Sequence, residues 1–285
     1  MENNSEQNNL IDGRALASKM FAQITEQVAA LNFKPVLCDV VVGNDLVSLS
    51  YVNIKGKRAK ECGMDFSLVQ LPDTATDEQV IAAIHEQQEN QNLCGLIVQL
   101  PLPAHLDSAK ILQAINLDVD VDGINPQSAG QNSQLVPPTA GAIMAILDSL
   151  PVNLVEQKFV VLGNGDLVGK PVSSELKKRN YATTTVLADT ENRAAILQSA
   201  TVIISGVGKT GILTGDQVSE GVIVVDAGTS EQGGSISGDV DFATVAPKAK
   251  FITPSPGGVG PVTVAKLLEN VLLVAKRLDI NIDKE

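Results

Sequence analysis

Two side chains with complementary chemistry stand four residues apart, at Tyr51 and Lys55. Positions i and i+4 share one face of a helix, so a phenol and an ammonium could together polarise a polar substrate there. The alternative is a solvated surface pair, and in either case we expect Lys55 to be surface-facing and to contribute little to stability. Short-chain dehydrogenases use the same Y-x-x-x-K spacing after their glycine motif. Here it precedes the glycine motif by more than 100 residues, which argues against that family.

A lone amide and a short acidic stretch supply further polar side chains. Gln99 ends an otherwise apolar run, so its amide must either find partners at a strand end or face a cleft. Asp118, Asp120 and Asp122 alternate, which resembles a calcium loop only superficially, because residue 129 is Ala where such a loop has a bidentate Glu. We therefore expect one functional carboxylate in this stretch.

A glycine-rich turn follows the apolar run 158–162 and precedes a helical pattern. Its glycines, Gly163, Gly165 and Gly169, follow G-x-G-x-x-x-G, a variant of the dinucleotide fingerprint. The alternative is a structural turn between a strand and a helix. Asp189 lies about 20 residues further on, where a carboxylate would accept hydrogen bonds from a ribose. Gly206 follows another strand, where ligands sit in open α/β sheets.

The elements that must position these residues follow a regular alternation. Near-continuous apolar runs rich in β-branched residues predict strands buried on both faces, as in parallel sheets. Helical patterns lie between them, so the chain is predicted to have an α/β fold. The predicted strands cover residues 35–42, 93–100, 158–162, 183–187, 201–205 and 222–226, and the predicted helices cover residues 11–31, 77–88, 139–150, 169–179 and 262–278.

The composition excludes several classes of protein. Twenty-one Lys and Arg stand against 33 Asp and Glu, a net charge of -12 that disfavours nucleic acids and anionic membranes as partners. Residues 1–9 are polar and predict a solvated tail rather than a signal peptide, and no apolar run is long enough for a membrane span, so we expect a cytoplasmic protein.

Isolated histidines, at His85 and His105, and three scattered cysteines give no metal-site spacing. The cysteines are expected to be small buried hydrophobes.

Taken together, these segments resemble one family, the bifunctional methylenetetrahydrofolate dehydrogenase and methenyltetrahydrofolate cyclohydrolase family. Residues 11–13 (I-D-G) resemble its start, and residues 50–55 (S-Y-V-N-I-K) resemble its Y-V-x-x-K helix. Residues 95–105 resemble its G-[IL]-[IL]-V-Q-L-P-L-P-x-H segment, and residues 121–123 resemble the end of D-V-D-G. The matches cover nearly the whole chain. The V-Q-L-P-L-P match and the match of residues 251–265 to the C-terminal signature are the most specific.

The resemblance implies an activity and residue roles. The enzyme would oxidise 5,10-methylenetetrahydrofolate to 5,10-methenyltetrahydrofolate by hydride transfer to NAD or NADP, then hydrolyse it to 10-formyltetrahydrofolate. Lys55 would be the catalytic ammonium or base of the hydrolysis, and Gln99 would hydrogen-bond Lys55 and tune its charge. Tyr51 would pack along the folate, and Asp122 would hold the pterin. The further substrate contacts that it implies are Val98, Leu100, Pro256, Gly257, Gly258, Val259 and Gly260.

The nucleotide side departs from the family pattern. The family often has G-R-S where this chain has Gly163-Asn164-Gly165, and a serine where it has Asp189. A carboxylate repels the 2′-phosphate of NADP and accepts hydrogen bonds from the free ribose of NAD, so we expect NAD or NADP to bind, with NAD favoured. The predicted cofactor-binding residues are Gly163, Asn164, Gly165, Gly169, Asp189, Gly206 and Thr229.

We expect two α/β domains with a cleft between them. Residues 10–140, together with a returning C-terminal helix at 264–285, would form the folate domain, and residues 141–263 would form a Rossmann-like dinucleotide domain. The resemblance also implies a homodimer. Two other interpretations remain at this stage: a degenerate relative that binds folate or nucleotide with one or both activities lost, and another two-domain dehydrogenase of a small polar substrate.

Overall fold

A computed structural model describes residues 9–128, 135–232 and 235–282. Within the described part, residue contacts divide the chain into two units, which we call the 18–138 unit and the 139–263 unit. The 18–138 unit also contains residues 264–282, and the 139–263 unit also contains residues 9–17. Residues 1–8 of the expected tail lie outside the described residues. Asn9, predicted to be solvated, instead donates from its amide to the carbonyls of Ala246 and Ala249 and is partly buried.

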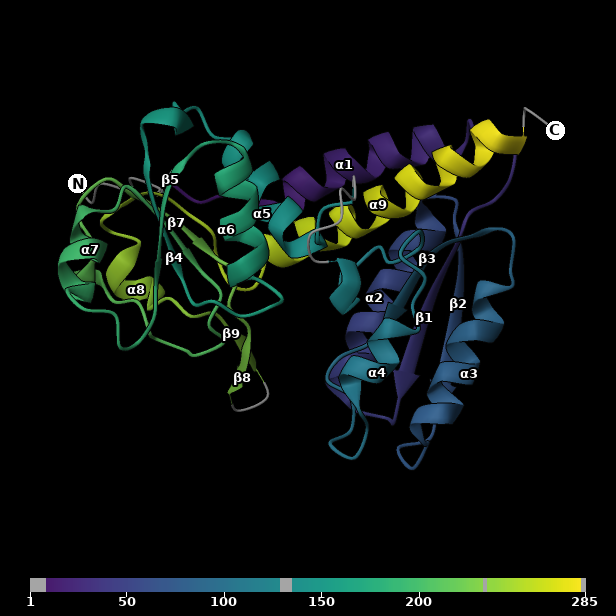
Figure 1. Cartoon of the computed structure of the whole chain (residues 1–285). Helices are drawn as coiled ribbons and strands as arrows, with labels where there is room; N and C mark the ends of the chain where they lie inside the picture. Colours follow the sequence, from purple (N-terminus) through teal and green to yellow (C-terminus); the bar gives the residue numbers. More distant parts are fainter. Residues whose placement is uncertain (1–8, 129–134, 233–234, 283–285) are drawn as a thin grey trace. The chain divides into compact units, whose positions relative to one another are not determined.

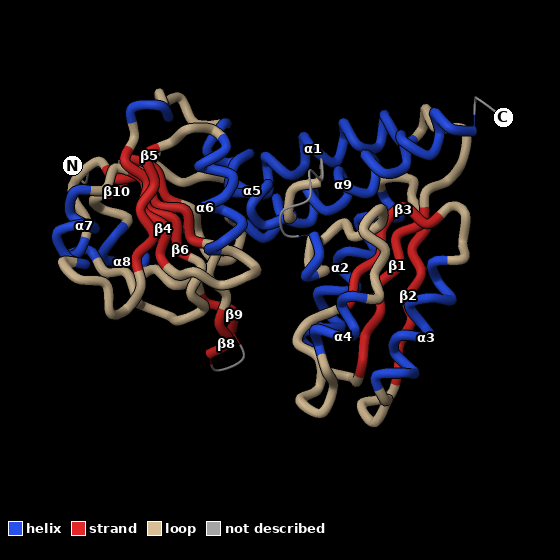
Figure 2. Tube along the Cα trace, viewed as in Figure 1, coloured by secondary structure: helices blue, strands red, loops and turns tan. Residues whose placement is uncertain are grey.

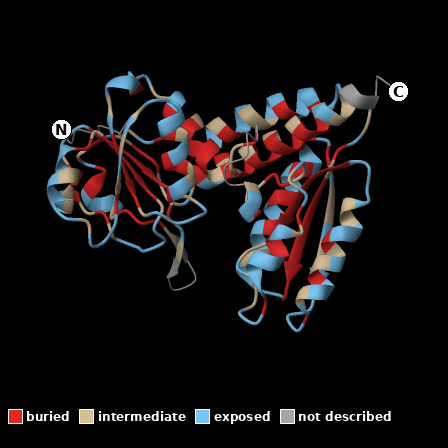
Figure 3. Cartoon of the chain, in the orientation of Figure 1, coloured by how far each residue is buried: buried red, intermediate tan, exposed pale blue. Residues whose placement is uncertain are grey.

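The 18–138 unit is built on a parallel three-stranded sheet. Its strands, in the order β2-β1-β3, are β1 (Val36–Val42), β2 (Asp65–Leu71) and β3 (Leu93–Val98). The central strand β1 and its neighbour β3 are buried almost throughout, whereas the edge strand β2 consists of exposed and half-buried residues (Figures 2 and 3).

Helices cover both faces of this sheet (Figure 1). On one face, β1 and β3 share an apolar cluster with α3 (Asp77–Gln88) and α4 (Ser108–Gln113). On the other face, a second cluster joins α2 (Leu46–Glu61), the later part of α1 (Gly13–Val28) and most of α9 (Val259–Ile282). The last helix therefore packs with residues 18–138. The short 3₁₀ helix η1 (Pro126–Ser128) belongs to the same unit.

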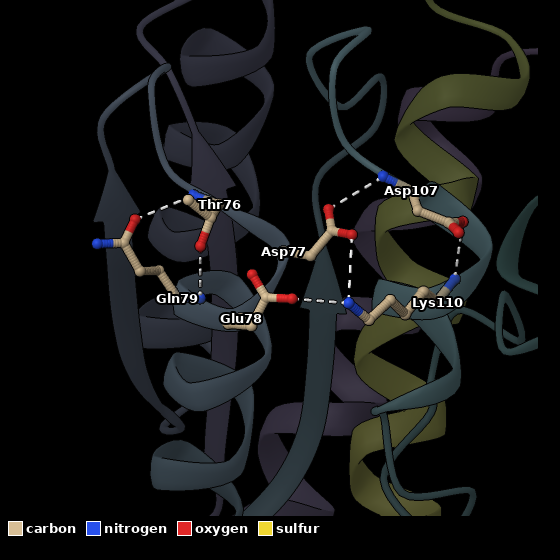
Figure 4. Close-up of polar contacts among 6 residues, drawn as sticks. All are labelled: Thr76, Asp77, Glu78, Gln79, Asp107 and Lys110. Atoms are coloured by element: carbon tan, nitrogen blue, oxygen red, sulfur yellow. Dashed lines mark hydrogen bonds and ion pairs between the residues drawn. The ribbon is translucent and has the colours of Figure 1, made fainter.

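Polar contacts fix the starts of α3 and α4 relative to each other (Figure 4). Thr76 and Gln79 form a capping box at the start of α3, which satisfies two helix N–H groups. Lys110 of α4 lies 2.9 Å from Glu78 and 3.5 Å from Asp77. The hydrogen bond from Lys110 is the main reason why the pKa of the exposed Glu78 carboxyl is lowered to about 2.

The 139–263 unit contains a larger parallel sheet with the strand order β10-β7-β6-β4-β5 (Figure 2). In chain order this arrangement is 2-1-3-4-5 read from the β5 edge, a doubly wound topology whose switch point lies between β4 and β6. A small antiparallel pair, β8 and β9, is separate from this sheet. The strands are β4 (Lys158–Leu162), β5 (Ala182–Val186), β6 (Val202–Ser205), β7 (Val222–Asp226), β8 (Ser230–Gln232), β9 (Ser235–Ser237) and β10 (Ala249–Ile252).

Helices also pack against this sheet. Helix α6 packs against β4 and β5, and an apolar cluster joins the strands to residues of α7 and α8. The chain segment at residues 9–12 lies beside β10. The Ile11 N–H donates to the Ile252 carbonyl, and the Ile252 N–H donates to the Asn9 carbonyl. The helices are α5 (Pro138–Asp148), α6 (Gly169–Lys178), α7 (Arg193–Ser199) and α8 (Phe242–Val245), with 3₁₀ helices η2 (Leu154–Glu156) and η3 (Gly215–Gln217).

The six predicted strands are present within two residues of their expected ends, and the α/β fold with parallel sheets is confirmed. The strands β2, β8, β9 and β10 were not predicted. All three cysteines are buried and free, as expected. Among the helices that the structure describes, none is long and apolar enough to cross a membrane.

Candidate active site

Helix α2 carries Lys55 over the central strand of the 18–138 unit. The helix begins after Asp45, whose carboxylate accepts a hydrogen bond from the Ser48 N–H. Gly56 allows close packing, because a Cβ atom there would lie 2.5 Å from the Phe66 ring of β2. The neighbouring Lys55 is consequently only 3% exposed.

Lys55 forms a buried ion pair. Its Nζ lies 2.6 Å from Oδ2 of Asp39, a residue of β1 with no exposed surface. At this distance the contact combines the attraction of opposite charges with a hydrogen bond from the amine to the carboxylate. Burial raises the pKa of the Asp39 carboxyl, and the attraction of Lys55 opposes that rise. The expectation that Lys55 is surface-facing was wrong, because α2 packs tightly enough to cover it.

Gln99 provides the second contact to the ammonium group. Its Oε1 lies 2.9 Å from Lys55 Nζ, and its Nε2 donates to the Leu100 carbonyl at 2.7 Å, which fixes the amide orientation. The backbone N–H of Gln99 bonds the Val40 carbonyl and holds the residue at the end of β3. The amide is therefore satisfied and is also oriented toward Lys55, as the resemblance implied.

Tyr51 lies one helical turn before Lys55. Lys55 Nζ is 5.4 Å from the centre of its ring, a distance at which a cation is attracted by an aromatic face. Although 38% of Tyr51 is exposed, desolvation by surrounding protein, together with repulsion from Asp122 and Asp39, raises the pKa of its phenol to about 12. Tyr51 therefore remains a neutral hydrogen-bonding group at physiological pH.

The two neighbouring carboxylates after β3 have different surroundings. Asp120 is buried and accepts hydrogen bonds from the N–H groups of Ile124 and Asn125 and from the Ser128 hydroxyl, so it holds the loop. Asp122 is half-buried, and desolvation raises its pKa to about 6 in spite of the attraction of Lys55. Asp122 is therefore the carboxylate of this stretch that is available for binding.

Two further predicted substrate contacts flank Gln99. Val98 is 1% exposed and its side chain belongs to an apolar core cluster, so its contribution to a site is limited to its backbone. Leu100 is half-buried at the strand end.

In the 139–263 unit, the glycine turn lies at the switch point of the sheet. A Cβ at Gly169 would lie 2.4 Å from the Gly163 carbonyl oxygen, and Gly163 itself has φ +92°, so both positions require glycine. The turn after β6 is adjacent, because a Cβ at Gly163 would lie 3.3 Å from the Gly206 oxygen. Asn164 and Gly165 are exposed. An exposed turn with closely approaching backbone at the carboxyl ends of β4 and β6 fits a dinucleotide phosphate.

Two buried carboxylates, neither predicted from the sequence, shape the turns after β6 and β7. Asp239 accepts hydrogen bonds from the Ser205 hydroxyl and from the N–H groups of Val207 and Lys209, at 2.7, 2.7 and 2.8 Å. Asp226, at the end of β7, accepts from three backbone N–H groups, those of Gly228, Asp239 and Val240. Burial raises the pKa of the Asp226 carboxyl to about 6. These bonds fix the loop that contains Gly206.

The remaining predicted nucleotide residues are exposed. Asp189 lies in the turn after β5, and Thr229 lies between β7 and β8 with its carbonyl oxygen near Gly208.

The segment before α9 is shaped by glycines. Gly257 has φ +109°, and a Cβ at Gly258 would lie 2.6 Å from the Pro254 oxygen. Gly13 approaches the same segment so closely that a Cβ there would overlap the Gly258 carbonyl. Pro256 and Gly260 are exposed, whereas Val259 is buried.

The structure thus brings Tyr51, Lys55, Gln99 and Asp122 into one cluster with Asp39, and separately brings together the turns after β4 and β6. The sequence signal for Asp39 was a single acid inside the apolar run 35–42, since such an acid needs a buried partner. Among the described residues, no group of histidine, cysteine and acidic side chains could hold a metal ion.

Family models match most of the chain. Residues 11–122 match the catalytic domain of tetrahydrofolate dehydrogenase/cyclohydrolase, and residues 137–279 match the NAD(P)-binding domain of the same family. The chain belongs to this family.

Individual relatives agree with the tetrahydrofolate dehydrogenase/cyclohydrolase assignment. The bifunctional protein FolD of Wolinella succinogenes is 39% identical over 276 residues, which cover 94% of this chain and 96% of that protein. The crystal structure of FolD from Campylobacter jejuni, a methylenetetrahydrofolate dehydrogenase/cyclohydrolase, has a TM-score of 0.90 at 34% identity and covers 94% of this chain and 98% of that one. The enzyme of Trypanosoma brucei, complexed with NADP and an inhibitor, has a TM-score of 0.89 at 34% identity, covering 94% and 97%.

The chain is accordingly a bifunctional enzyme. It oxidises 5,10-methylenetetrahydrofolate to 5,10-methenyltetrahydrofolate by hydride transfer to a nicotinamide dinucleotide, and it hydrolyses the product to 10-formyltetrahydrofolate. Neither a degenerate binding protein nor a dehydrogenase of another substrate has support in these matches.

Proposed function

We propose that the cluster around Lys55 binds the folate and carries the proton transfer of the hydrolysis. The observation that carries this proposal is the position of Lys55 Nζ, 2.6 Å from Asp39 and 2.9 Å from Gln99, because both contacts fix an amine at one point. Water must attack the methenyl carbon and a carbon–nitrogen bond must break, so a positioned proton-transfer group is required. In the absence of a suitably placed histidine, Lys55 is that group.

Tyr51 and Asp122 orient the substrate in this proposal. A pterin presents a ring N–H and an amino group side by side, and a carboxylate accepts hydrogen bonds from both. Asp122 is half-buried and keeps such acceptors available. The partly exposed ring of Tyr51 offers an apolar surface along which the folate lies, with the phenol as a neutral donor.

Substitution of Lys55 tests the proposal. Lys55→Met leaves Asp39 without its partner, so the double variant Asp39→Val with Lys55→Met is made alongside it to keep the site apolar and folded. We expect both variants to lose about 100-fold or more of the methenyl hydrolysis, as is typical for loss of a general acid or base. Hydrolysis at the wild-type rate by either variant would overturn the role of Lys55.

The dinucleotide site is proposed at the carboxyl ends of β4 and β6. The turn of Gly163, Asn164 and Gly165, with Gly169 at the start of α6, would receive the phosphates through backbone N–H groups, and Gly206 and Thr229 would line the neighbouring turns. When bound there, the nicotinamide supplies the hydride acceptor. The segment from Pro256 to Gly260 would line the site where folate and nicotinamide meet.

We further propose that NAD is preferred over NADP. Asp189 is exposed in the turn after β5, where it would face a ribose, and its charge opposes a 2′-phosphate. The cations that could offset it are engaged elsewhere. Lys170 lies 2.6 Å from Asp166, and Arg193 donates to the Ile212 carbonyl.

The preference is measured as the ratio of kcat/KM with NAD to that with NADP. We expect Asp189→Ser to shift this ratio at least about tenfold toward NADP, the size of one lost charge contact at a ligand. Glu220→Ser is the matched control, since it removes an exposed acid of the same unit at the opposite ends of the strands. A wild-type preference for NADP would contradict the proposal, and an unchanged ratio in Asp189→Ser would contradict its mechanism.

We also infer a homodimer located in the cytoplasm. The resemblance to the family supports the dimer, and the three free cysteines, Cys38, Cys62 and Cys94, fit a reducing compartment and support the location. Sedimentation equilibrium of the purified chain tests the first statement, and fractionation of the source cells tests the second.

A further inference from the structure

The buried ion pair distinguishes between two roles that remain open for Lys55. A lysine that acts as a base must lose its proton before water attacks, whereas a lysine that acts as an acid must keep it. A carboxylate 2.6 Å away, in a site with almost no solvent exposure, stabilises the charged amine.

We propose that Lys55 acts in its charged ammonium form, as a proton donor, and that Asp39 is the positioning residue that holds it in that form. This inference rests on the proposed function of Lys55 and specifies its charge. Asp39 lies on the face of β1 that carries α2, so its carboxylate contacts the amine and does not need to touch substrate.

The neighbouring groups favour the same charge state. Those with titratable protons are Tyr51 on α2, Asp122 in the loop after β3 and Cys38 beside Asp39 on β1. Tyr51 remains a neutral phenol, and Cys38, with a pKa raised to about 12 by burial and by Asp39, remains a neutral thiol. Desolvation raises the pKa of Asp122 to about 6 in spite of the attraction of Lys55, so above that pH Asp122 adds a second negative charge near the amine. Gln99 turns its amide oxygen toward the amine, and the negative end of that dipole stabilises a positive charge on Nζ.

The ammonium fits the bond-breaking step. Water adds its oxygen to the methenyl carbon of the cationic substrate, and one water proton leaves to solvent. The bond from that carbon to N5 then breaks with its electron pair going to N5, which takes a proton from Lys55 Nζ. The hydroxyl becomes the formyl carbonyl, and its proton returns to Nζ through water. One water is consumed and one proton is released overall.

The test compares Asp39→Asn with Asp65→Asn. Both change one acid to an amide in adjacent parallel strands, but Asp65 pairs with the exposed Lys34, so it serves as the matched control.

The rate of methenyl hydrolysis is measured from mildly acidic to alkaline pH, after subtraction of the uncatalysed reaction. Removal of the anion favours the uncharged amine. We therefore expect the alkaline decline of kcat to move at least about one pH unit lower in Asp39→Asn, with about a tenfold loss at the wild-type optimum. Asp65→Asn should match the wild type.

Two outcomes overturn the inference. One is a pH profile of Asp39→Asn that superimposes on the wild type. The other is a gain of activity at low pH, which would show that Lys55 acts as the free amine. Loss of hydrolysis in Lys55→Met with an unchanged Asp39→Asn profile would refute only this inference, whereas retained hydrolysis in Lys55→Met would refute the proposed function itself.

A measurement on the unmodified enzyme covers the case in which Asp39→Asn does not fold. Protein labelled with ¹⁵N at the lysine Nζ atoms is examined by NMR at the pH of maximal hydrolysis, with the Lys55 signal assigned by its disappearance in Lys55→Arg. An ammonium chemical shift for Lys55 supports the inference, and a free-amine shift contradicts it.

Discussion

Asp39 of β1 and Lys55 of α2 are paired at 2.6 Å in a site where neither side chain has more than 4% of its surface exposed. The acid comes from the centre of a sheet and the amine from a helix that covers it. A charge pair in this position requires both members, because removal of either one leaves a buried charge without compensation.

The pair predicts a non-additive effect on stability. Lys55→Met and Asp39→Val should each lower the free energy of unfolding by about 3–5 kcal/mol, and the double variant should recover most of the loss because the two apolar side chains replace the pair together. Urea denaturation of the four proteins measures this cycle. Losses that add in the double variant would mean that the two residues are not energetically coupled.

Asp122 predicts a pH dependence of folate binding. Its pKa is raised to about 6, so the carboxylate is present above that pH and is lost as the pH falls through it. The KM for methylenetetrahydrofolate should rise on acidification below about pH 6, and Asp122→Ala should raise it about 10- to 100-fold at neutral pH while leaving the affinity for NAD nearly unchanged. Asp118→Ala is the control in the same loop. An equal loss of NAD affinity would indicate misfolding instead.

Asp239 predicts that the two activities can be separated. The Asp239 carboxylate accepts three hydrogen bonds. In Asp239→Asn, the amide N–H group would face one of these three donors and lose that bond, which disturbs the loop at residues 206–209. The KM for the dinucleotide should rise about tenfold, the cost of one hydrogen bond to a charged group, while methenyl hydrolysis, which uses no dinucleotide, stays within about twofold. Asp241→Asn provides the comparison two residues away. A parallel fall of both activities would argue against this role.

Asp226 predicts a change of stability with pH. Its pKa is about 6 when folded and 3.8 when unfolded, so the folded state binds the proton more tightly, and the resulting stabilisation is present below about pH 4 and lost as the pH rises through 6. Asp226→Asn lacks this titration. As the pH rises from about 4 to about 7, the wild type should lose about 3 kcal/mol of unfolding free energy that Asp226→Asn does not lose. The difference between the two proteins should therefore change by that amount, in addition to any pH-independent cost of the substitution. A constant difference between the two proteins would refute the shift.

The sequence predicted the buried strands well because burial on both faces leaves a clear pattern. Five of the six predicted strands are buried almost throughout, and only β5 is mostly exposed or half-buried. The edge strand β2 was missed because its seven residues, D-F-S-L-V-Q-L, mix polar and apolar types in a way that a helix end also permits. The edge strand β10 was missed because its four residues, A-K-F-I, contain an exposed lysine that interrupts the apolar run.

The candidate site was predicted only where a residue had a recognisable motif. Tyr51, Lys55 and Gln99 belonged to such motifs, and the structure brings them together. Asp39 and Asp239 had none, because what distinguishes them is the partner that the fold supplies: an amine from α2 for one and the loop after β6 for the other. Burial of Lys55 was also missed, since it depends on the small volume of Gly56 and on the position of Phe66.

The division of the chain into units has a consequence for biosynthesis. Leu268 and Val271 of α9 have no exposed surface and complete the apolar cluster of the 18–138 unit, yet they are translated after the whole of residues 139–263. The ribosome therefore finishes an entire second sheet before it makes the helix that covers the first one. One face of β1 and β3 therefore stays only partly covered, by α1 and α2, until the end of synthesis, and during that interval its apolar residues are exposed to aggregation and to chaperones.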